Sequence, residues 1–343
     1  GYVAEARSYV TWLLQECCNI EEFHPKNIQT MYGLHGEKDL EEEILPHLEG
    51  YMGSKPVRIG NSASLQKQWD IYGSLLDTIW RIHLMDSSYE INERTWDTLR
   101  RFANHVVKIW RQPDEGLWEV RSGRRHFLYS KAMCWVALDR AIKIAKEYGF
   151  KGEVETWKIE KEAIRKKVME RGWSKEKQSF VQSFDSKDVD ASLLLLSSVG
   201  FIAGDDPKMI STIQTIEQEL SVQNGLLLRY TTPDGLPGRE GAFLPASFWL
   251  IGALIFAGQR ERARKHFEHL IKLANHVGLY AEEINPKSEQ FLGNFPQAYT
   301  HIGLINSAFY MAFGKRGGHL FKEKVTTRQK IQNLMRKFSS VKP

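Results

Sequence analysis

Cysteine is scarce in this sequence, and its arrangement argues against a disulfide framework. The chain has three Cys in 343 residues. Cys17 and Cys18 are adjacent in a segment with a helical pattern, so their side chains point in different directions. With Cys134 the total is odd, which also disfavours a set of paired cysteines. Few cysteines favour a reducing compartment, and a cytoplasmic location is our expectation.

The motifs of several common catalytic sites are also missing. No HExxH motif for zinc is present, and the histidines at 266 and 269 have a different spacing on a charged helix. Ser62, Ser130 and Ser247 lie outside any GxSxG context. No glycine-rich phosphate loop follows a strand. We therefore expect no metal site, no serine-nucleophile chemistry and no phosphate-binding loop.

An excess of one charge is absent from most of the chain. The net charge is +5, but residues 314–343 contain nine Lys or Arg and one Glu, which leaves residues 1–313 at about −3. The body of the chain therefore lacks the basic patch of a nucleic-acid-binding protein. Long apolar runs are rare: Gly241–Ala257 has no charge in 17 residues, but it is short for a bilayer and contains Pro245. We expect this run to be buried core, and we expect no membrane partner.

Strand signals are almost absent, whereas helical periodicity recurs along the chain, so the predicted class is all-α. Helices are expected over residues 2–18, 39–48, 62–85, 92–110, 127–148, 153–171, 188–199, 207–220, 241–257, 259–276 and 297–313, with the basic tail as one more. A short strand is expected at residues 226–230, leading into a turn at residues 232–238.

Apolar helices alternate with polar ones along the chain. The mainly apolar segments are 62–85, 127–148, 188–199, 241–257 and 297–313, and a more polar helix follows each of them. The polar segment Glu153–Gly172, for example, has 11 charged residues in 20. A helix that is apolar all round has to be buried on all sides, while an amphipathic helix covers it from outside. The alternation therefore predicts an inner ring of helices and an outer ring around it.

Four long loops would surround a central cavity in such a double ring: residues 50–61, 113–125, 225–241 and 277–296. The second of them, from Pro113 to Arg125, places Trp118 next to Glu119. A flat apolar ring can contact the C–H face of a sugar, and a carboxyl group can transfer protons. The alternative is that Trp118 only anchors the loop among solvated charges.

The fourth loop supplies two more carboxyl groups, Glu282 and Glu283. Hydrolysis of a glycosidic bond requires two carboxyl groups, one to protonate the leaving oxygen and one to activate water or to act as nucleophile. The separation of the two groups distinguishes inversion from retention, and spacing along the chain does not reveal it.

Several ordered blocks resemble glycoside hydrolase family 15, and most of all its prokaryotic branch of glucoamylases and trehalases. The resemblance covers about residues 1–313. The blocks are GLWEVR at 116–121, HFLYSK at 126–131, WVALDR at 135–140, DGLPG at 234–238, EGAF at 240–243, AEE at 281–283 and GNFPQ at 293–297.

The resemblance implies an (α/α)6 toroid of concentric inner and outer helices, inverting chemistry, and no metal or organic cofactor. Carried over by position, Glu119 would be the general acid. Glu282 would be the general base that activates water, and Glu283 is the weaker candidate for that role.

Four further residues would bind the substrate by the same resemblance. Trp118 would stack on the sugar in the subsite before the cleaved bond, and Arg229 would bind sugar hydroxyls there. Asp70 and His301 would line the cleft, with a structural polar role as the alternative for both.

The chain departs from the family pattern at its N-terminus. It begins with Gly rather than Met, no signal peptide opens it, and the Trp-x-Arg-Asp block that starts the toroid in the family is missing. The β-sandwich domain that normally precedes the toroid is absent too. We therefore expect a toroid that lacks the first inner helix, with residues 1–313 as an incomplete catalytic domain and the basic segment 314–343 as the last outer helix.

Three hypotheses of function follow. The first is an exo-acting α-glucosidase of glucoamylase type, which releases glucose from α-linked glucans or oligosaccharides. The second is an α,α-trehalase on the same scaffold, which would use the same acid and base and differ only in the pocket beyond the cleaved bond. The third is a catalytically silent toroid that binds sugar.

Overall fold

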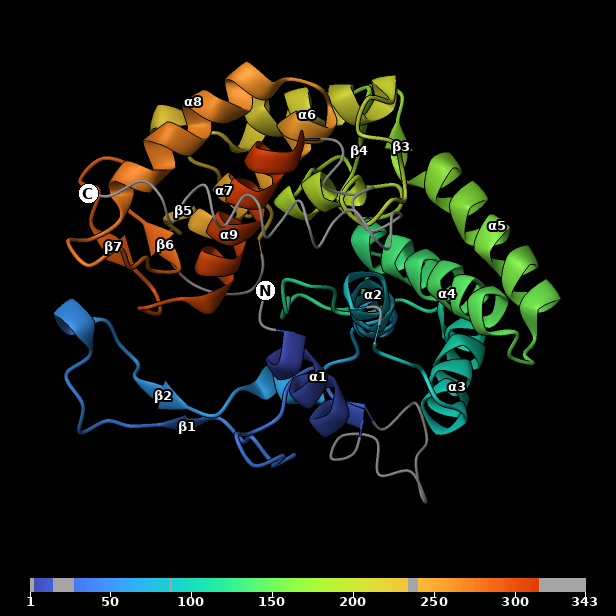
Figure 1. Ribbon diagram of the computed structural model, residues 1–343. Coiled ribbons are helices and arrows are strands. Elements are labelled where there is room, and N and C mark those ends of the chain that lie inside the picture. Colours follow the sequence, from blue (N-terminus) through green and yellow to red (C-terminus); the bar gives the residue numbers. More distant parts are fainter. Residues whose placement is uncertain (1–2, 15–27, 87, 234–239, 315–343) are drawn as a thin grey trace, which may run out of the picture. The chain divides into compact units, whose positions relative to one another are not determined.

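The computed structural model describes residues 3–14, 28–86, 88–233 and 240–314 (Figure 1). The chain divides into two compact units. Unit 1 comprises Gly1–Leu76 and Ile91–Ile164, and unit 2 comprises Asp77–Glu90 and Arg165–Pro343. Helices α2 (Asp70–Met85) and α5 (Val154–Arg171) each begin in unit 1 and end in unit 2.

Unit 1 has its core where α3 (Glu93–Ile109) packs against α4 (Leu128–Tyr148). Helix α3 is amphipathic: Leu99, Phe102 and Val106 recur at helical spacing and are fully buried. The other elements that lie wholly in unit 1 are α1 (Val3–Trp12), β1 (Glu43–Ile44), η3 (Tyr51–Gly53), β2 (Arg58–Ile59) and η4 (Ser62–Leu65).

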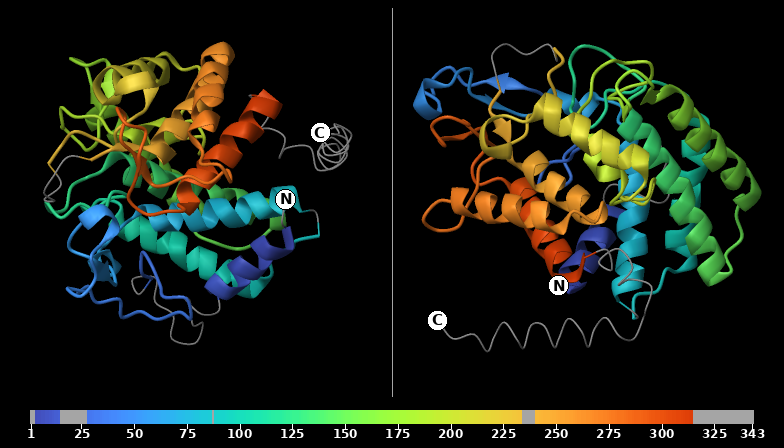
Figure 2. Two further views of the ribbon diagram at one scale, coloured as in Figure 1. Left: turned by 90° about the vertical axis from the view of Figure 1, so that its left-hand side faces the viewer. Right: turned by 90° about the horizontal axis from the view of Figure 1, so that it is seen from above.

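Unit 2 has its core around α7 (Leu244–Phe256), which packs against α8 (Arg260–Leu270) and α9 (Ala298–Phe313) (Figure 1). Figure 2 shows these helices, coloured orange to red, from two further sides. Every residue of α7 except Trp249 and Phe256 is buried, so the prediction of a buried apolar helix is confirmed. The other elements of unit 2 are β3 (Trp173–Ser174), β4 (Ser179–Phe180), η5 (Ala191–Leu196), α6 (Pro207–Leu220), η6 (Gln223–Gly225), β5 (Ala242–Phe243), η7 (Ile271–Leu273), β6 (Glu283–Ile284) and β7 (Phe291–Leu292).

A small antiparallel sheet in unit 2 orders the loop that carries the predicted base. Its strand order is β5-β6-β7, with Phe243 opposite Glu283 and Glu283 opposite Leu292. Each strand has only two residues, as in the separate pairs β1–β2 and β3–β4. The sheet joins the start of α7 to loop 277–296 and thereby fixes the backbone immediately after Glu282.

Most predicted helices are present because strong local signals define their ends. Segments 92–110, 127–148, 153–171, 207–220, 241–257 and 297–313 correspond to α3, α4, α5, α6, α7 and α9, with ends that differ by three residues at most. The side chain of Asn92 accepts a hydrogen bond from the Thr95 N–H group and begins α3. Gly149, with a left-handed φ of 68°, ends α4. Segment 259–276 corresponds to α8 followed by η7, and the helix stops at Leu273.

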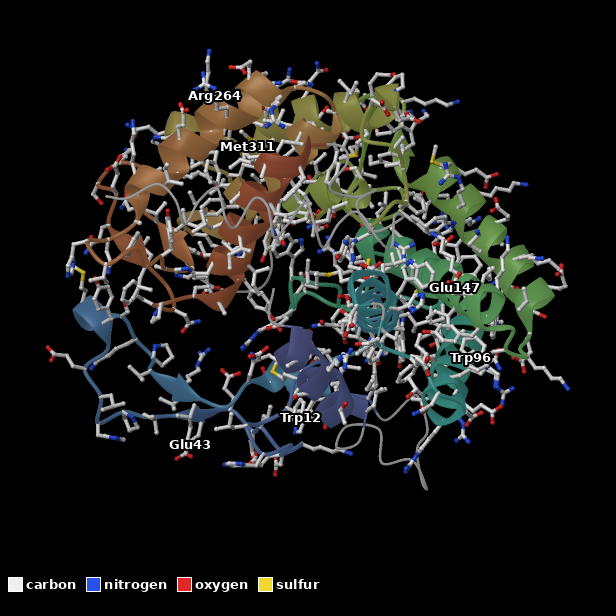
Figure 3. The ribbon with its side chains drawn as sticks, in the orientation of Figure 1. Trp12, Glu43, Trp96, Glu147, Arg264 and Met311 are labelled. Carbon is white, nitrogen blue, oxygen red and sulfur yellow. The ribbon has the colours of Figure 1, made fainter. Side chains whose placement is uncertain are left out.

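The predicted acidic helix at residues 39–48 is wrong. The segment is extended instead, and β1 pairs with β2 so that Ile44 lies opposite Arg58. The Arg58 guanidinium lies 2.9 Å from the Glu42 carboxylate, and the Glu43 side chain points away from the strand (Figure 3). In a helix Asp39 would lie on the same face as Glu42 and Glu43, three and four residues later, and like charges at this spacing repel one another. In the strand pair, Arg58 compensates the charge of Glu42.

The predicted helix at residues 62–85 begins later than expected. Ser62–Leu65 forms the short helix η4, which the Asn61 side chain caps by accepting from the Ala63 N–H group, and α2 begins only at Asp70. Between them, residues 66–69 use their backbone and side-chain groups for hydrogen bonds to residues 112–120. These bonds to distant residues take the place of helical hydrogen bonds in residues 66–69. The local sequence pattern contains no signal for such distant partners.

Two shorter elements also differ from expectation. The helix predicted at residues 188–199 is the 3-10 helix η5, where the Asp190 carboxylate accepts hydrogen bonds from the N–H and hydroxyl groups of Ser192. The strand predicted at residues 226–230 makes only isolated bridges, from Leu227 to Ser221 and from Tyr230 to Asp190.

Helix α9, predicted as an inner helix, buries only small side chains. Gly303 approaches Phe248 so closely that a Cβ atom would lie 2.9 Å from the Phe248 Cβ, and the Ser307 hydroxyl donates to the Phe248 carbonyl at 3.0 Å. Its large apolar residues Tyr299, Ile302 and Ile305 are exposed. The small residues allow α9 to pack closely on α7. Tyr299, Ile302 and Ile305 therefore lie on a different, exposed face of the helix.

Some predictions fall outside the described residues: the helical tail after residue 314, the end of helix 2–18 with Cys17 and Cys18, and most of the turn at 232–238. The remaining cysteine, Cys134, is free and buried, and burial raises the pKa of its thiol to about 12. Among the helices of the described chain, none is both long and apolar enough to cross a membrane.

Candidate functional site

The predicted acid lies in a loop of unit 1 that connects α3 to α4. Asp114 and Arg125 close this loop at its base, since the N–H group of each donates to the carbonyl oxygen of the other at 2.9 Å. Trp118 and Glu119 lie between these two anchors, and both are half-buried. These two backbone hydrogen bonds therefore hold the base of the loop in place without a bound substrate.

Glu119 has a backbone conformation that is unusual for a residue with a side chain. Its φ is 55°, in the left-handed region, and its N–H group donates to the Gly116 carbonyl at 3.3 Å. Such a conformation costs on the order of 1–3 kcal/mol and persists only where the surroundings hold it. Residues in this state are enriched at functional sites, so the conformation supports Glu119 as a candidate together with its place in loop 113–125. Other residues such as Glu289, with a φ of 56°, share the conformation.

The segment before α2 binds the loop from outside. The Glu115 N–H group donates to the Lys67 carbonyl at 3.0 Å, and the Lys67 N–H group donates to the Glu115 carboxylate at 2.8 Å. The Trp69 N–H group donates to the Asp114 carboxylate at 3.1 Å. The side-chain amide of Gln66 lies 3.2 Å from the Glu119 carbonyl oxygen. This network fixes the loop to the start of α2.

A buried charged cluster lies beneath the loop. Burial raises the pKa of Asp70 to about 7, and the carboxylates of Asp114 and Glu119 act in the same direction. Burial also raises the pKa of Asp114 to about 6, although the Lys131 ammonium opposes this. Burial lowers the pKa of Lys131, whose ammonium group donates to the Gln112 carbonyl. Asp70 is thus close enough to Glu119 for their charges to interact, but it is buried.

The predicted base lies in unit 2, immediately before β6. One oxygen of Glu282, Oε2, accepts hydrogen bonds from the backbone and side-chain N–H groups of Asn294 at 3.2 and 2.9 Å. Within the described residues, no group bonds to the other oxygen, Oε1. A Cβ atom on Gly293 would lie 3.1 Å from the Glu282 carboxylate, so the glycine makes room for it. The carboxylate is oriented by one oxygen and leaves the other available.

Glu283 has the opposite arrangement, since successive residues of a strand point to opposite faces. Its Oε1 lies 3.3 Å from the Arg229 guanidinium, and its Oε2 accepts from the Gly241 N–H group at 2.9 Å. Burial raises the pKa of Glu283 to about 7, although Arg229 and the Gly241 N–H group lower it. Both carboxylate oxygens of Glu283 are therefore occupied by bonds to other residues of unit 2.

Arg229 is held by two carboxylates. Its Nε and Nη2 atoms donate to Glu240, the former at 2.9 Å, and Nη2 also faces Glu283. Burial opposes the charge of Arg229, but the hydrogen bond and charge of Glu240 outweigh burial and raise the pKa of the guanidinium. No acceptor in the described part of the chain bonds to Nη1. Only this nitrogen is left for the predicted contact with sugar hydroxyls.

His301 lies on α9 and contacts the segment that leads to Glu282. Its Nε2 atom accepts from the Tyr280 N–H group at 3.2 Å, which assigns the ring proton to Nδ1. The imidazole also packs edge-on against the Tyr280 ring, at 5.5 Å between centroids. The neighbouring Thr300 hydroxyl donates to the Ala281 carbonyl at 2.8 Å. His301 therefore supports the backbone just before Glu282.

The six predicted site residues form two groups. Trp118, Glu119 and Asp70 gather around the loop of unit 1. Arg229, Glu282 and His301 gather around β6 of unit 2. No group of three or more His, Cys, Asp or Glu that could hold a metal ion occurs among the described residues.

Sequence analysis missed the groups that orient the candidates. In unit 1, Gln66 bonds to the Glu119 carbonyl, and Asp114 bonds its loop to Trp69. In unit 2, Glu240 bonds to Arg229, and Asn294 bonds to Glu282. Asn294 stands in one of the blocks that carry the family resemblance, so a signal for it was present. Gln66 acts over 53 residues of chain and has no local signal.

Comparison with known proteins places this chain in a family. A model of "Glycosyl hydrolases family 15" matches residues 1–309. A trehalase of Mycobacterium tuberculosis is 44% identical over 296 residues, which cover 85% of this chain and 43% of the relative. A trehalase of Thermoplasma acidophilum is 40% identical over 309 residues, which cover 90% of this chain and 52% of the relative. The chain thus spans about half the length of the relatives it matches.

A solved structure of a bacterial glucoamylase complexed with acarbose matches with a TM-score of 0.61 and 16% identity, over 74% of this chain and 42% of that one. At this identity the likeness establishes the fold, and the predicted all-α, glucoamylase-like class is confirmed. The family match and the identities to the trehalases establish more than fold: the chain belongs to glycosyl hydrolases family 15.

Proposed function

We propose that the protein is a glycoside hydrolase that cleaves α,α-trehalose with inversion of configuration. Glu119 donates its proton to the oxygen that links the two glucose units. As the C1–O bond breaks, a water molecule attacks the same C1 atom and gives a proton to Glu282. The products are two glucose molecules, and no other reactant is consumed.

Three features of the carboxyl groups support this assignment. Glu119 has a left-handed backbone that its surroundings maintain. Glu282 is oriented through Oε2 and has Oε1 available to accept a proton from water. Glu283 uses both oxygens for Arg229 and Gly241, which favours Glu282 as the base.

The substrate is proposed from one observation: the relatives at 40–44% identity bear the name trehalase. This supports the second of the three hypotheses from sequence over the first. Hydrolysis of α-glucans ranks below it, because the likeness to glucoamylase structures concerns the fold. In this proposal Trp118 stacks on the sugar, Arg229 binds hydroxyls through Nη1, and His301 supports the base. The burial of Asp70 favours an electrostatic role over direct sugar contact.

The test compares wild type with Glu119→Gln and Glu282→Gln in the complete natural protein that contains this chain, on trehalose, maltose, isomaltose and soluble starch. Each substitution should lower kcat on trehalose by about 10²–10⁴-fold, because it removes one partner of acid–base catalysis. Glu289→Gln, in the same loop as Glu282, and Glu155→Gln, on α5, are matched controls with exposed side chains and should keep wild-type kcat.

The anomers of the product test the mechanism directly. Inversion at one C1 of α,α-trehalose yields one β-glucose from the attacked unit and one α-glucose from the leaving unit, whereas retention yields two α-glucose molecules. Proton NMR within seconds of mixing distinguishes these outcomes. Faster turnover of starch or maltose would favour the glucan hypothesis. Binding of trehalose without turnover would favour the silent sugar-binding hypothesis and would refute the proposal.

A further inference from the structure

The side chain of Gln66 bonds to the backbone of loop 113–125 at the proposed general acid. Its amide nitrogen lies 3.2 Å from the carbonyl oxygen of Glu119 and 3.4 Å from that of Val120. One NH₂ group has two N–H donors, so a single amide can serve both carbonyls. These carbonyls flank the peptide bond that follows the left-handed Glu119.

Gln66 is itself held in place from two sides. Its backbone N–H group donates to the Ala63 carbonyl at 3.0 Å and thereby ends η4. Its side-chain oxygen accepts a hydrogen bond from the Gln68 amide at 3.2 Å, and Gln68 is buried. An amide whose oxygen is bonded in this way has its nitrogen directed at the loop. The arrangement is therefore a chain of hydrogen bonds from Gln68 through Gln66 to the Glu119 carbonyl.

We propose that Gln66 is a positioning residue that keeps Glu119 in its left-handed conformation and so fixes where the carboxyl group points. The part that concerns catalysis rests on the proposed role of Glu119 as general acid. Without the amide, the two carbonyls lose the hydrogen bonds that Gln66 supplies, and the peptide after Glu119 turns more easily to an ordinary conformation. The Glu119 side chain would then leave the position from which it reaches the leaving oxygen, and small displacements of a reacting group cost rate steeply.

A residue that only adds packing or stability would behave differently on substitution. Gln66→Glu keeps the shape of the side chain but replaces the donors by acceptors that face two carbonyl oxygens. Gln66→Met keeps the length and removes the donors without adding repulsion. The proposal therefore predicts a larger loss in Gln66→Glu than in Gln66→Met, whereas a packing role predicts the reverse order.

The matched control is Gln29→Met. The Gln29 amide also serves two carbonyls of unit 1, those of Lys38 at 2.9 Å and Ser64 at 3.3 Å, but it bonds to no residue of loop 113–125. Loss of this bridge should leave kcat within twofold of wild type.

Two measurements on wild type and the three variants test the inference. Steady-state kinetics on trehalose should show kcat lowered by about 10- to 100-fold in Gln66→Met, with KM changed by less than threefold. Hydrogen exchange followed by mass spectrometry should show faster exchange in peptides that cover residues 114–121, with no change across α3 or α4. Wild-type exchange in these peptides of Gln66→Met would overturn the inference, and so would wild-type kcat.

The exchange measurement does not depend on turnover. If wild type hydrolyses no α-glucoside, the proposed function fails, while exchange in residues 114–121 still decides whether Gln66 holds the Glu119 backbone.

Discussion

Glu119 and Glu282 are oriented by different means, although both are carboxyl groups in loops. Glu119 is directed through its backbone, because its left-handed φ is held by bonds to its carbonyl and N–H groups. Glu282 is directed through its side chain, because Asn294 holds one carboxylate oxygen. In the proposed mechanism one group releases a proton and the other accepts one, and each requires a fixed direction. The bonds that fix both directions come from residues that take no part in the proposed proton transfers.

At the scale of single residues, Arg229 offers a test of a partly buried group of charges. Arg229→Met leaves the carboxylates of Glu240 and Glu283 without their cation, and we expect the free energy of unfolding to fall by about 1–3 kcal/mol, because the three side chains are only partly buried. The loss should be larger at pH 8 than at pH 5, because Glu283, with a pKa of about 7, is mainly neutral at the lower value. Urea unfolding at both values measures this.

Arg264 is the matched control, since it also bonds two carboxylates, Glu261 and Glu268, but points outward from α8 (Figure 3). Arg264→Met should change the urea midpoint little, because exposed ion pairs contribute little. Equal losses in the two variants would show that burial is not what makes Arg229 important.

At the scale of elements, close helix packing depends on glycine at one position of α2. A Cβ atom on Gly73 would lie 2.2 Å from the Met133 carbonyl oxygen of α4 and 2.8 Å from its carbonyl carbon. Backbone atoms of a helix cannot move aside as a flexible side chain can. The approach of α2 to α4 within unit 1 therefore depends on the absence of a side chain.

We predict that Gly73→Ala destabilises the protein by about 2 kcal/mol or more, because overpacking outweighs the higher helix propensity of Ala. Gly252→Ala in α7 is the matched control: its Cβ atom would meet only the ring of Tyr310, at 3.3 Å. That change should be nearly neutral. Differential scanning calorimetry of both variants measures the effect, and a Gly73→Ala protein as stable as Gly252→Ala would contradict it.

At the scale of the whole molecule, buried carboxyl groups determine how stability depends on pH. Asp70, Asp114 and Glu283 have pKa values raised by burial to about 7, 6 and 7. A raised pKa means that the folded state favours the neutral acid. The stabilisation is therefore complete below about pH 4 and is lost as the pH rises through 6 to 7.

Other carboxyl groups act in the opposite sense, but at lower pH. Burial opposes the charge of Asp139, but Lys143, Arg140 and Lys161 outweigh burial and lower its pKa. The stability that this group contributes is lost only as the pH falls through its lowered pKa. Burial also lowers the pKa of His266, so the stability that this group contributes is lost as the pH falls through its lowered pKa. Between pH 5 and 8 we expect the three carboxyl groups with raised pKa values to outweigh this one imidazole.

We therefore predict a higher urea midpoint at pH 5 than at pH 8. The double substitution Asp70→Asn and Glu283→Gln should reduce the corresponding difference in the free energy of unfolding by several kcal/mol, since one pKa unit corresponds to about 1.4 kcal/mol. Circular dichroism at the two pH values provides the measurement. A midpoint that rises from pH 5 to pH 8 in wild type would contradict the assignment of these groups as neutral acids.

The sequence by itself determined the features that depend on local signals. Helical periodicity predicted α3 to α7, and the predicted ends differ from the observed ones by at most three residues. The prediction succeeded because apolar spacing and caps such as Asn92 act within one turn. The uncharged run at α7 predicted a buried helix. Ordered blocks around Glu119 and Glu282 identified the family and both candidate carboxyl groups, since these residue types in fixed order are specific.

Tertiary structure alone decided the features that depend on distant residues. The late start of α2, the strand pairing at residues 43–59 and the placement of Gln66 against Glu119 depend on contacts between residues 14 to 53 positions apart. The different roles of Glu282 and Glu283 also became visible only with their partners, Asn294, Arg229 and Gly241. Hydrogen bonds and ion pairs between residues far apart in the sequence form only where folding brings the two groups together. The spacing of two residues along the chain does not determine the distance between them in the folded protein.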